Sequence, residues 1–477
     1  MSKRTIYIIV LLVVYMASCG ARGDASSGVS PTGESTASGG GDPATGSGSA
    51  VASGTGGAGG AGGAGGAGGA GGAGGAGGAG GGGDCELALS GDQVLLERAG
   101  YQIEPDVVWN AVDDRFLAVW SDSREDDPNS FFIEYDIYGQ LFEANGKPAA
   151  PDFRVNEGMV AGRQNFVPKV VHNRIDNEYL VVWESMEQVV ARRLDAGGAP
   201  LGGDFTVPDG ASSTRNDSMP AVAFDPLTEE YLVLWGSVPA VFNGTPATVY
   251  ARRVSGQGAL LGTNITAYVH KNIYVYGLGL EHNTTKNEYL AVWNADTDDA
   301  GYDTFAQRLS IDGSPIGEAQ RMKKPEWQVA PEVAYSPSEE AFVITYRENH
   351  NDGSGDISAR RLDASGLPQA NDFLVHSSVG AWVSYSSVTY DDCAEKFLLA
   401  WSVNGSPGSV LANLFGSDGV PAMAVLPVAP DVTVGDTSEI DIASAYSASS
   451  KTHLVVFSAA GPMSSEEDIY AQALSSK

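Results

Sequence analysis

The sequence predicts an all-β protein: a seven-bladed β-propeller of four-stranded blades, closed by an N-terminal strand that completes the last blade. Two observations support this fold class. A phrase of aromatic, apolar, apolar, apolar, aromatic recurs seven times after residue 115, and the segments around each copy keep a constant distance from it. A repeat of about 56 residues that contains four short strands has the size of a propeller blade.

The recurring phrase predicts a buried strand. It is short, rich in β-branched and aromatic residues, and bounded by turn residues, which together favour a strand over a helix. Its copies end 63, 52, 58, 53, 55 and 56 residues apart. They occupy residues 116–120, 179–183, 231–235, 289–293, 342–346, 397–401 and 453–457.

Three further strands are expected around each phrase. A strand precedes it, with an aromatic residue or histidine at a fixed position and, in four copies, a proline at its start, where a missing N–H costs least. A third strand follows, with a residue no larger than alanine at one recurring position, and a turn glycine then leads into a fourth strand. The aromatic or histidine positions are Trp109, His172, Phe224, His282, Tyr335, Tyr390 and Tyr446, and the small positions are Gly139, Ala191, Ala251, Ala306, Ala359, Ala412 and Ala471.

The two ends of the repeat region, residues 85–477, complete one another. The seventh unit stops at Lys477 after its third strand, and a spare strand-like segment, 93–97, precedes the first unit. If that segment completes the last blade, the ring closes with no free edge, whereas an open solenoid would leave it unpaired. Cys85 precedes the spare strand, and Cys393 lies in the first turn of the adjacent sixth blade. We therefore predict a Cys85–Cys393 disulfide that clamps this seam.

The first 84 residues predict export and tethering. Lys3 and Arg4 precede an apolar run, 6–16, which has the length of a signal peptide and is too short to span a bilayer. The following Met-Ala-Ser-Cys-Gly resembles a lipobox, which implies a lipoprotein signal peptide over 1–18 and a lipidated Cys19; the alternative is an ordinary signal peptide. The resemblance also implies an outer-membrane lipoprotein, on the cell surface or the periplasmic face.

A Gly/Ala/Ser-rich segment, 19–84, is predicted to be a disordered, lipid-anchored spacer. It contains a long Gly-Gly-Ala repeat without proline and lacks the apolar surface that would offset the chain entropy of folding. As a random coil it has a root-mean-square span on the order of 45 Å. Its expected role is to hold the propeller away from the membrane.

The first unit resembles a repeat found in large secreted and surface proteins of Gram-negative bacteria. Trp120-Ser-Asp122-Ser-Arg124 matches their Trp-x-Asp-x-Arg, and the Asp-Ile-Tyr-Gly-Gln at 136–140 matches the phrase that follows it in those proteins. Only the first unit carries both halves in full. The resemblance implies a β-propeller displayed outside the cytoplasm, and it implies no catalytic residue.

Composition and motifs exclude several functions. The net charge of −31 opposes binding to phosphate backbones, so we expect no nucleic-acid partner. The Gly-x-Ser-x-Gly and phosphate-loop motifs are absent, and the six histidines lack metal-ligand spacing. His172 and His282 are interpreted as packing residues because they replace aromatics. Arginine pairs such as Arg192-Arg193 lie within strands, where neighbouring side chains face opposite ways, so they do not predict a sialidase-like arginine cluster.

Two acid-rich loops have two interpretations. Carboxylates at such density bind Ca²⁺ in flexible loops, or they are simply solvated. Their spacing matches no EF-hand, and no resident cofactor is expected. The acids are Asp122, Asp126 and Asp127 after the first phrase, and Asp296, Asp298 and Asp299 after the fourth.

The predicted function is non-enzymatic: a membrane-anchored, surface-displayed binding or scaffold module of unknown ligand. It is expected to be a monomer whose partner is an envelope protein or a polysaccharide. Catalytic residues confined to one blade are not evident, which favours this interpretation. The alternative is a glycan-binding or glycan-hydrolysing propeller, which carboxylates converging on the central channel would favour. Aromatic residues before the first strands either stack on sugars or pack over the channel. They are Phe166, Tyr274, Tyr276, Trp327, Trp382 and Tyr385.

Overall fold

A computed structural model provides the structure of the protein. Cys19, Cys85, the signal peptide and the spacer lie outside the residues it describes, so the expectations about them remain predictions. Within the described part, no helix is long and apolar enough to cross a membrane. The described residues are 87–126, 133–157, 164–210, 215–240, 246–271, 274–297, 301–324, 326–350, 354–369, 372–378, 382–404, 408–432, 440–460 and 466–476.

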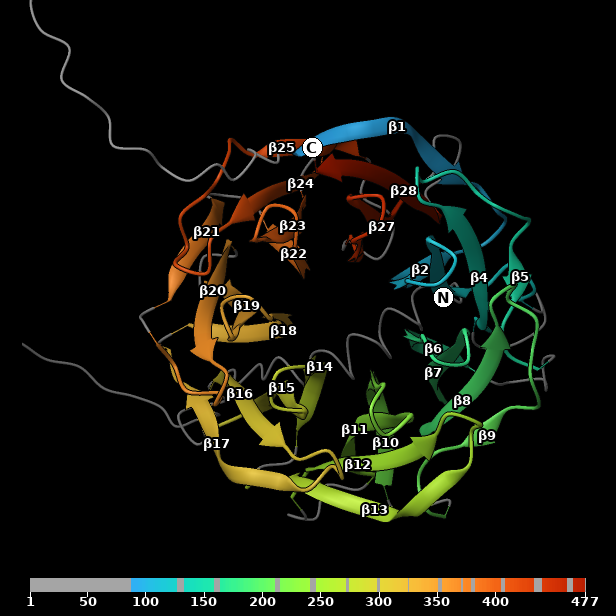
Figure 1. The fold of residues 1–477 in the computed structure, drawn as a ribbon, viewed down its shortest axis with the longest axis vertical. Coiled ribbons are helices and arrows are strands. Elements are labelled where there is room, and N and C mark those ends of the chain that lie inside the picture. Colours follow the sequence, from blue (N-terminus) through green and yellow to red (C-terminus); the bar gives the residue numbers. More distant parts are fainter. Residues whose placement is uncertain are drawn as a thin grey trace, which may run out of the picture. The chain divides into compact units, whose positions relative to one another are not determined.

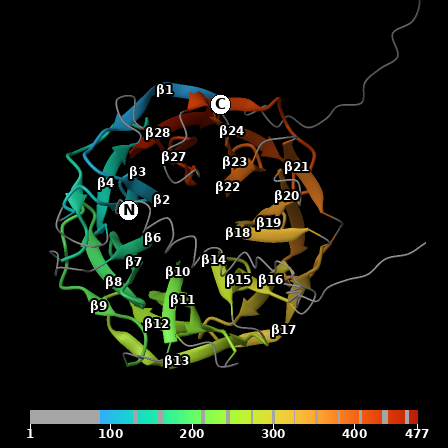
Figure 2. The same cartoon turned by 180° about the vertical axis from the view of Figure 1, so that it is seen from behind.

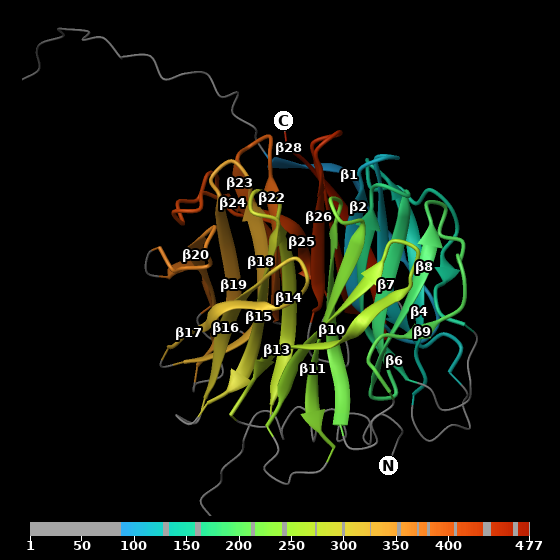
Figure 3. The ribbon, with the colours of Figure 1, turned by 60° about the horizontal axis from the view of Figure 1, so that its bottom comes forward.

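The described residues form seven four-stranded antiparallel sheets arranged as blades around a central axis, which confirms the predicted seven-bladed propeller (Figure 1). The same closed ring is seen from behind in Figure 2. The first strand of each blade is innermost and contacts the first strands of the neighbouring blades. Viewed from the side, the strands run between two faces on which the turns gather (Figure 3).

The first four blades follow one another along the chain, each in the order innermost to outermost strand. The first blade contains β2 (Gln102–Asn110), β3 (Arg115–Asp122), β4 (Asp136–Glu143) and β5 (Phe153–Arg154). The second contains β6 (Asn165–Asn173), β7 (Glu178–Ser185), β8 (Gln188–Asp195) and β9 (Phe205–Thr206). The third contains β10 (Arg215–Asp225), β11 (Glu230–Pro239), β12 (Thr248–Ser255) and β13 (Leu260–Val269), and the fourth contains β14 (Val275–Asn283), β15 (Glu288–Asp296), β16 (Tyr302–Leu309) and β17 (Pro315–Met322).

The last blade takes its outermost strand from the beginning of the chain. The fifth blade contains β18 (Trp327–Ser336), β19 (Ala341–Asn349), β20 (Gly355–Asp363) and β21 (Phe373–Ser378). The sixth contains β22 (Trp382–Asp391), β23 (Lys396–Asn404), β24 (Gly408–Phe415) and β25 (Leu426–Val432). The seventh contains β26 (Ile442–Ser447), β27 (Thr452–Ala460), β28 (Glu467–Ser476) and β1 (Leu87–Leu96).

The apolar core lies between neighbouring blades, which explains why the recurring phrase is apolar at every position. In β3, Leu117 and Val119 pack against the second blade. Trp120 points the other way and packs with residues of the seventh blade. Both faces of the second strand are therefore buried, so the strand has no polar side.

A tight turn with one architecture joins the first and second strands of every blade. In the first blade the side chain of Asn110 accepts hydrogen bonds from the N–H groups of Val112 and Asp113, each at 2.9 Å. The turn then needs a positive φ, which Asp114 adopts at 52°. Asn and Asp side chains hold such turns by bonding the backbone locally. The positive-φ residues of the other six turns are Asn177, Glu229, Asn287, Glu340, Glu395 and Lys451.

The small residue predicted in the third strand makes room for the fourth strand. A Cβ placed on Gly139 would meet the ring of Phe153, in β5, at 3.2 Å. The next residue, Gln140, donates from its amide to the carbonyl of Ala150, which precedes β5. Side chains of five other blades make the same bond to the backbone that begins or precedes their outermost strand. These bonds are Arg192–Gly202, Arg252–Gly262, Gln307–Ile316, Asn413–Met423 and Gln472–Ser90.

The N-terminal strand closes the ring as predicted. β1 pairs antiparallel with β28, from Leu87 opposite Ser476 to Leu96 opposite Ile469. Gln472 of β28 donates to the carbonyl of Ser90 in β1, so the closing strand is held by the bond that holds the outer strand in other blades. Cys393 is disulfide-bonded. Its pairing with Cys85 remains a prediction, because both other cysteines lie outside the described residues.

Candidate functional site

Seven charged side chains gather around the axis and form the axial cluster. Six are carboxylates and one is a lysine, and they come from five of the seven blades. Each member shifts the pKa of another member, has its own pKa shifted by another member, or bonds another member directly. The members are Glu104 and Asp106 of β2, Lys169 of β6, Glu184 of β7, Glu281 of β14, Glu332 of β18, and Asp441, which directly precedes β26.

Lys169 bridges the axis. Its Nζ lies 3.6 Å from the carboxylate of Asp106 in the neighbouring blade and 3.9 Å from that of Glu332 in the fifth blade. Burial opposes a charged ammonium, but the attraction of Asp106 and Glu332 outweighs it and raises the pKa of Lys169. The three side chains keep 26%, 18% and 39% of their surface exposed, so solvent reaches the centre of the ring.

Three of the axial carboxylates hold strained backbone. Glu104, Val167 and Met219 occupy equivalent bulges before a proline and have φ of 56°, 49° and 52°. The carboxylate of Asp441 accepts the N–H of Glu104 at 3.1 Å, and that of Glu104 accepts the N–H of Val167 at 2.8 Å. Glu184 accepts the N–H of Met219. These bonds run from blade to blade, and they give Asp441, Glu104 and Glu184 a structural role.

Glu281 and Glu332 have no such role. No hydrogen bond joins either carboxylate to another of the described residues, and the two come from adjacent blades. Burial, together with the charge of Glu332, raises the pKa of Glu281 to about 8. Burial also raises the pKa of Glu332, against the opposing effect of Lys169. The charge of Glu332 thus acts on Glu281, and Lys169 opposes the rise in the pKa of Glu332.

Aromatic residues from the predicted ligand face lie at the beginnings of the innermost strands. Phe166 packs on Tyr135, with ring centroids 5.0 Å apart. Trp327 meets the ring of Tyr302 edge-on at 5.5 Å. Phe166 and Trp327 are both half-buried. Each ring therefore packs against a neighbouring aromatic ring and keeps part of its surface in solvent.

Trp382 and Tyr385 share an arginine. The Arg347 guanidinium lies 4.9 Å from the centroid of Trp382 and 5.8 Å from that of Tyr385. Its Nη1 donates to the carbonyls of Val383 and Ser384, so the cation fixes the start of β22. Tyr276 belongs to β14, but its side chain lies outside the described residues.

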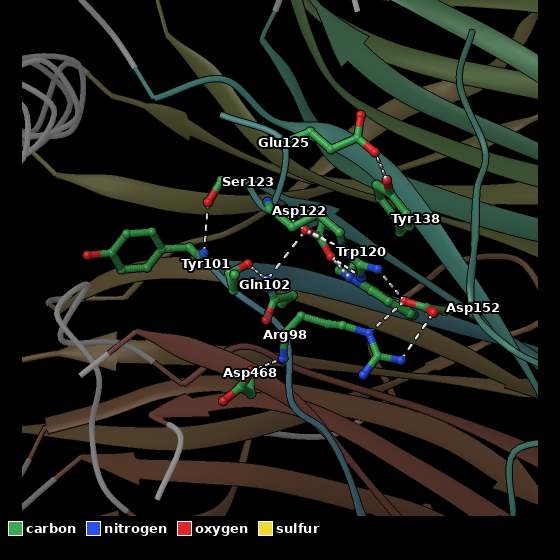
Figure 4. Close-up of polar contacts among 12 residues, drawn as sticks. Arg98, Tyr101, Gln102, Trp120, Asp122, Ser123, Glu125, Tyr138, Asp152 and Asp468 are labelled. Carbon is green, nitrogen blue, oxygen red and sulfur yellow. Dashed lines mark hydrogen bonds and ion pairs between the residues drawn. The ribbon is translucent and has the colours of Figure 1, made fainter. Parts of the chain in front are cut away.

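The acid-rich loop of the first blade is organised by an arginine. The buried carboxylate of Asp122 accepts hydrogen bonds from Trp120 Nε1 at 2.8 Å and from Nε and Nη2 of Arg124 at 2.9 and 2.5 Å. The Arg124 guanidinium lies 3.9 Å from the centre of the Tyr138 ring. Figure 4 shows this cluster. The Trp-x-Asp-x-Arg motif is thus a structural unit. The carboxylate of Asp122 binds the guanidinium of Arg124, and no bond to a calcium ion is needed to hold it.

The same cluster joins the first blade to the ring closure. Asp152 pairs with Arg124 at 2.6 Å and with Arg98, in the link between β1 and β2, at 3.1 Å (Figure 4). The N–H of Arg98 donates to Asp468 of β28 at 2.9 Å. The carboxylate of Asp468 therefore holds the backbone that leads from the closing strand into the first blade.

The other calcium candidates receive no support as ligands. Asp126 accepts the N–H of Glu134 at 3.0 Å, and Asp296 accepts that of Tyr274 at 3.1 Å, so both carboxylates fix loops. Within the described ranges, no group of three or more His, Cys, Asp or Glu residues is placed to hold a metal ion. The remaining candidates lie outside those ranges. They are Asp127, Asp298 and Asp299.

The arginine pairs and histidines have the structural roles expected of them. Arg192 donates to the carbonyl of Gly202, just before the outer strand of its blade, and its neighbour Arg193 pairs with Glu178 at 2.5 Å. His172 packs on the ring of Tyr179, 5.4 Å between centroids, and bonds Asn177. His282 repeats this arrangement with Tyr289 and Asn287.

Sequence reasoning missed the axial cluster, although one signal was present. Glu104 and Asp106 flank Pro105, Lys169 follows Pro168, and Glu332 follows Pro331. A charged residue beside the proline near the start of an otherwise apolar innermost strand is therefore the sequence signal for a charge on the axis. The ring geometry is needed to show which of these charges meet.

The solved structures that the chain resembles are distant from it in sequence and in structure. No protein-family model and no curated protein matches the chain. Among solved structures, a protein of unknown function from Dyadobacter fermentans is 12% identical, with 82% of this chain and 99% of that one covered and a TM-score of 0.49. The Dos1 propeller is 10% identical, with 81% and 94% covered and a TM-score of 0.48. An exo-β-1,3-galactanase from Phanerochaete chrysosporium is 13% identical, with 82% and 96% covered and a TM-score of 0.37.

Proposed function

We propose that the chain is a lipid-anchored propeller of the cell envelope that binds a polysaccharide, without catalysis, along the axis and at the end where the innermost strands begin. The axial cluster is the observation that carries this proposal. Its charges differ from blade to blade, and solvent reaches Lys169 and Glu332 at its centre.

Carbohydrate suits this chemistry. Ionised carboxylates accept hydrogen bonds from hydroxyl groups, and a lysine donates to them. Half-buried rings such as Phe166 and Trp327 offer apolar surface for sugar faces. The high net negative charge disfavours an anionic polymer as the ligand, so a neutral or amino-sugar polysaccharide fits better.

Glycan hydrolysis is the second candidate, and the pair Glu281 and Glu332 favours it. Glycosidases use one protonated carboxyl group as general acid and a second carboxylate as base or nucleophile. A protonated Glu281 would donate its proton to the leaving glycosidic oxygen. An ionised Glu332 would activate water or attack the sugar.

One experiment separates the candidates. Purified propeller, residues 85–477, is screened on a glycan array with and without Ca²⁺, and retained glycans are then incubated in solution and analysed for shorter products. Retention without products supports the binding module. Products that disappear in Glu281→Gln support hydrolysis. Absence of retention on every glycan contradicts a carbohydrate ligand and leaves an envelope protein as the partner to seek.

A further inference from the structure

Three neighbouring blades present an aliphatic side chain to solvent at the same position of the turn that joins their first two strands. The position is the second after the Asn or Asp that begins the turn. These residues keep 54%, 49% and 74% of their surface exposed, so they lie outside the core between the blades. They are Val112, Ile175 and Leu227, of the first, second and third blades, and together they form the aliphatic arc.

The turns fix how these residues are presented. In all three, the backbone N–H of the aliphatic residue donates to the side chain of the Asn or Asp that begins the turn, at 2.9 Å. Such local bonds define the turn, so the backbone beneath each aliphatic side chain has little freedom left to lose when a partner binds. Contact residues that are held in place before binding favour affinity, because the cost of ordering them is small.

The three turns also contact one another. The side-chain amide of Asn177, in the second turn, donates to Asp113 of the first at 3.2 Å. The second and third turns meet at Gly256, where a Cβ would lie 3.0 Å from the carboxylate of Asp176 and 3.1 Å from the carbonyl oxygen of Glu229. The aliphatic arc therefore belongs to one continuous surface.

The other four blades have no aliphatic residue at this position, and two of them use it to bond the next blade. Thr285 accepts a hydrogen bond from the hydroxyl group of Tyr335 at 2.7 Å. Ser338 bonds the hydroxyl group of Tyr390 at 2.6 Å. The blades that follow Val112, Ile175 and Leu227 have no hydroxyl group at the place of these tyrosines, where the residues are His172, Phe224 and His282. This position thus serves blade contacts on one side of the ring and is open to solvent on the other.

An exposed carboxylate stands within two residues of each aliphatic side chain. The carboxylates are those of Asp113, Asp176 and Glu229. Arg174 is the one exposed cation of the three turns, all of whose residues the structure describes. The surface around the aliphatic arc therefore has an excess of negative charge, and apolar and acidic side chains alternate along it.

We propose that the aliphatic arc is a docking surface for a segment of a partner protein in which apolar side chains alternate with lysine or arginine. Exposed apolar side chains that gather within a polar rim mark interaction sites. The apolar side chains of the segment cover Val112, Ile175 and Leu227, and its cations meet the three carboxylates. A second copy of the chain fits less well, because it would bring the same carboxylates face to face.

This surface is separate from the proposed glycan site. The turns stand where the innermost strands end, whereas the glycan site is proposed where those strands begin. The inference therefore goes beyond the proposed function and does not rest on it.

Fluorescence anisotropy tests the inference with a labelled dodecapeptide of alternating leucine and lysine, titrated with the purified chain. In the triple variant Val112→Ser/Ile175→Ser/Leu227→Ser, we expect the dissociation constant to rise at least about tenfold, because three apolar side chains are no longer removed from water on binding. A dodecapeptide of alternating serine and lysine measures the attraction of charge alone. It should bind wild type at least about tenfold more weakly than the leucine peptide, and bind the triple variant equally.

A matched variant controls for loss of aliphatic surface elsewhere. Leu89→Ser/Val269→Ser/Leu374→Ser removes side chains that are 48%, 53% and 56% exposed on the outermost strands β1, β13 and β21. Its affinity for the leucine peptide should equal that of wild type. The variant Asp113→Asn/Asp176→Asn/Glu229→Gln tests the charges: it should bind the leucine peptide more weakly than wild type, and its affinity should depend less on salt. All of these positions are exposed, so an unchanged Tm is expected for each variant.

Equal affinity of wild type and the Val112/Ile175/Leu227 variant for the leucine peptide would overturn the inference, and so would an equal loss in the outer-strand variant. A wild-type dimer in sedimentation velocity that the Val112/Ile175/Leu227 variant does not form would assign the surface to a second copy and also overturn it. Glycan retention by the same variants is measured separately on the array. Absence of glycan binding would contradict the proposed function and leave the peptide result intact.

Discussion

The outer strands and the axis of the propeller differ in how far the blades resemble one another. In six blades a side chain of the third strand bonds the backbone of the fourth strand or of the residues just before it, as Gln307 bonds Ile316. On the axis, one equivalent position of the innermost strands holds a carboxylate in two blades, a lysine in one, a serine in one and glycine or alanine in three. Around the ring this position is occupied by Asp106, Lys169, Ala221, Gly279, Glu332, Ser387 and Ala443. Repeated contacts build the blade, and the proposed site lies where the blades depart from repetition.

The largest effect is expected from removing a structural carboxylate of the first blade. Asp122→Ala leaves the buried Trp120 Nε1 without its acceptor and Arg124 with one carboxylate fewer. Loss of one partner from a buried ion pair costs about 3 kcal/mol. Urea denaturation should show a decrease of this size in the free energy of unfolding. The control is Asp92→Ala, at an exposed position of β1; an equal loss there would show that the Asp122 contacts contribute nothing specific.

Replacing an axial carboxylate should weaken ligand binding and leave stability nearly unchanged. Glu332→Gln removes the charge that Lys169 contacts and leaves the blade-building bonds intact. We expect affinity for the glycan retained on the array to fall at least tenfold, about 1.4 kcal/mol, with little change in unfolding free energy. Glu318→Gln, on the exposed outer strand β17, is the matched control. Unchanged binding by Glu332→Gln would contradict an axial site.

The pH dependence of stability should distinguish the axis from the rest of the molecule. The pKa of Glu281 is about 8 in the folded protein, well above its ordinary value. Such a group makes the folded state bind more protons than the unfolded state, so stability is lost as pH rises from about 4.5 to 8. Glu281→Gln should therefore be more stable than wild type at pH 8.5, and nearly equal to it at pH 4.5. If the variant and wild type were equally stable at both pH values, the pKa of Glu281 would not be raised in the folded protein.

The fold was predictable from the sequence because its signals are local and repeat seven times. The buried phrase, the polar turn, the small residue of the third strand and the closing strand each recur or complete a pattern, and the structure confirms them. The axial cluster was not predictable, because Lys169 meets Glu332 only when four blades have been placed around the ring. The Trp120–Asp122–Arg124 unit was visible as a motif, but its internal pairing needed coordinates, so Asp122 was considered a calcium ligand.

The smallest effect is expected at a histidine that occupies an aromatic position. Burial lowers the pKa of His172, so the unfolded state takes up a proton before the folded state does. Stability from this group is present above about pH 6.5 and is lost as pH falls through the folded pKa. His172→Phe keeps the packing on Tyr179 and gives up the bond to Asn177, which costs about 1 kcal/mol or less at pH 7. Between pH 7 and pH 5 the variant should lose less stability than wild type. A variant that binds no glycan would show instead that His172, although it belongs to the repeat, contributes to the site.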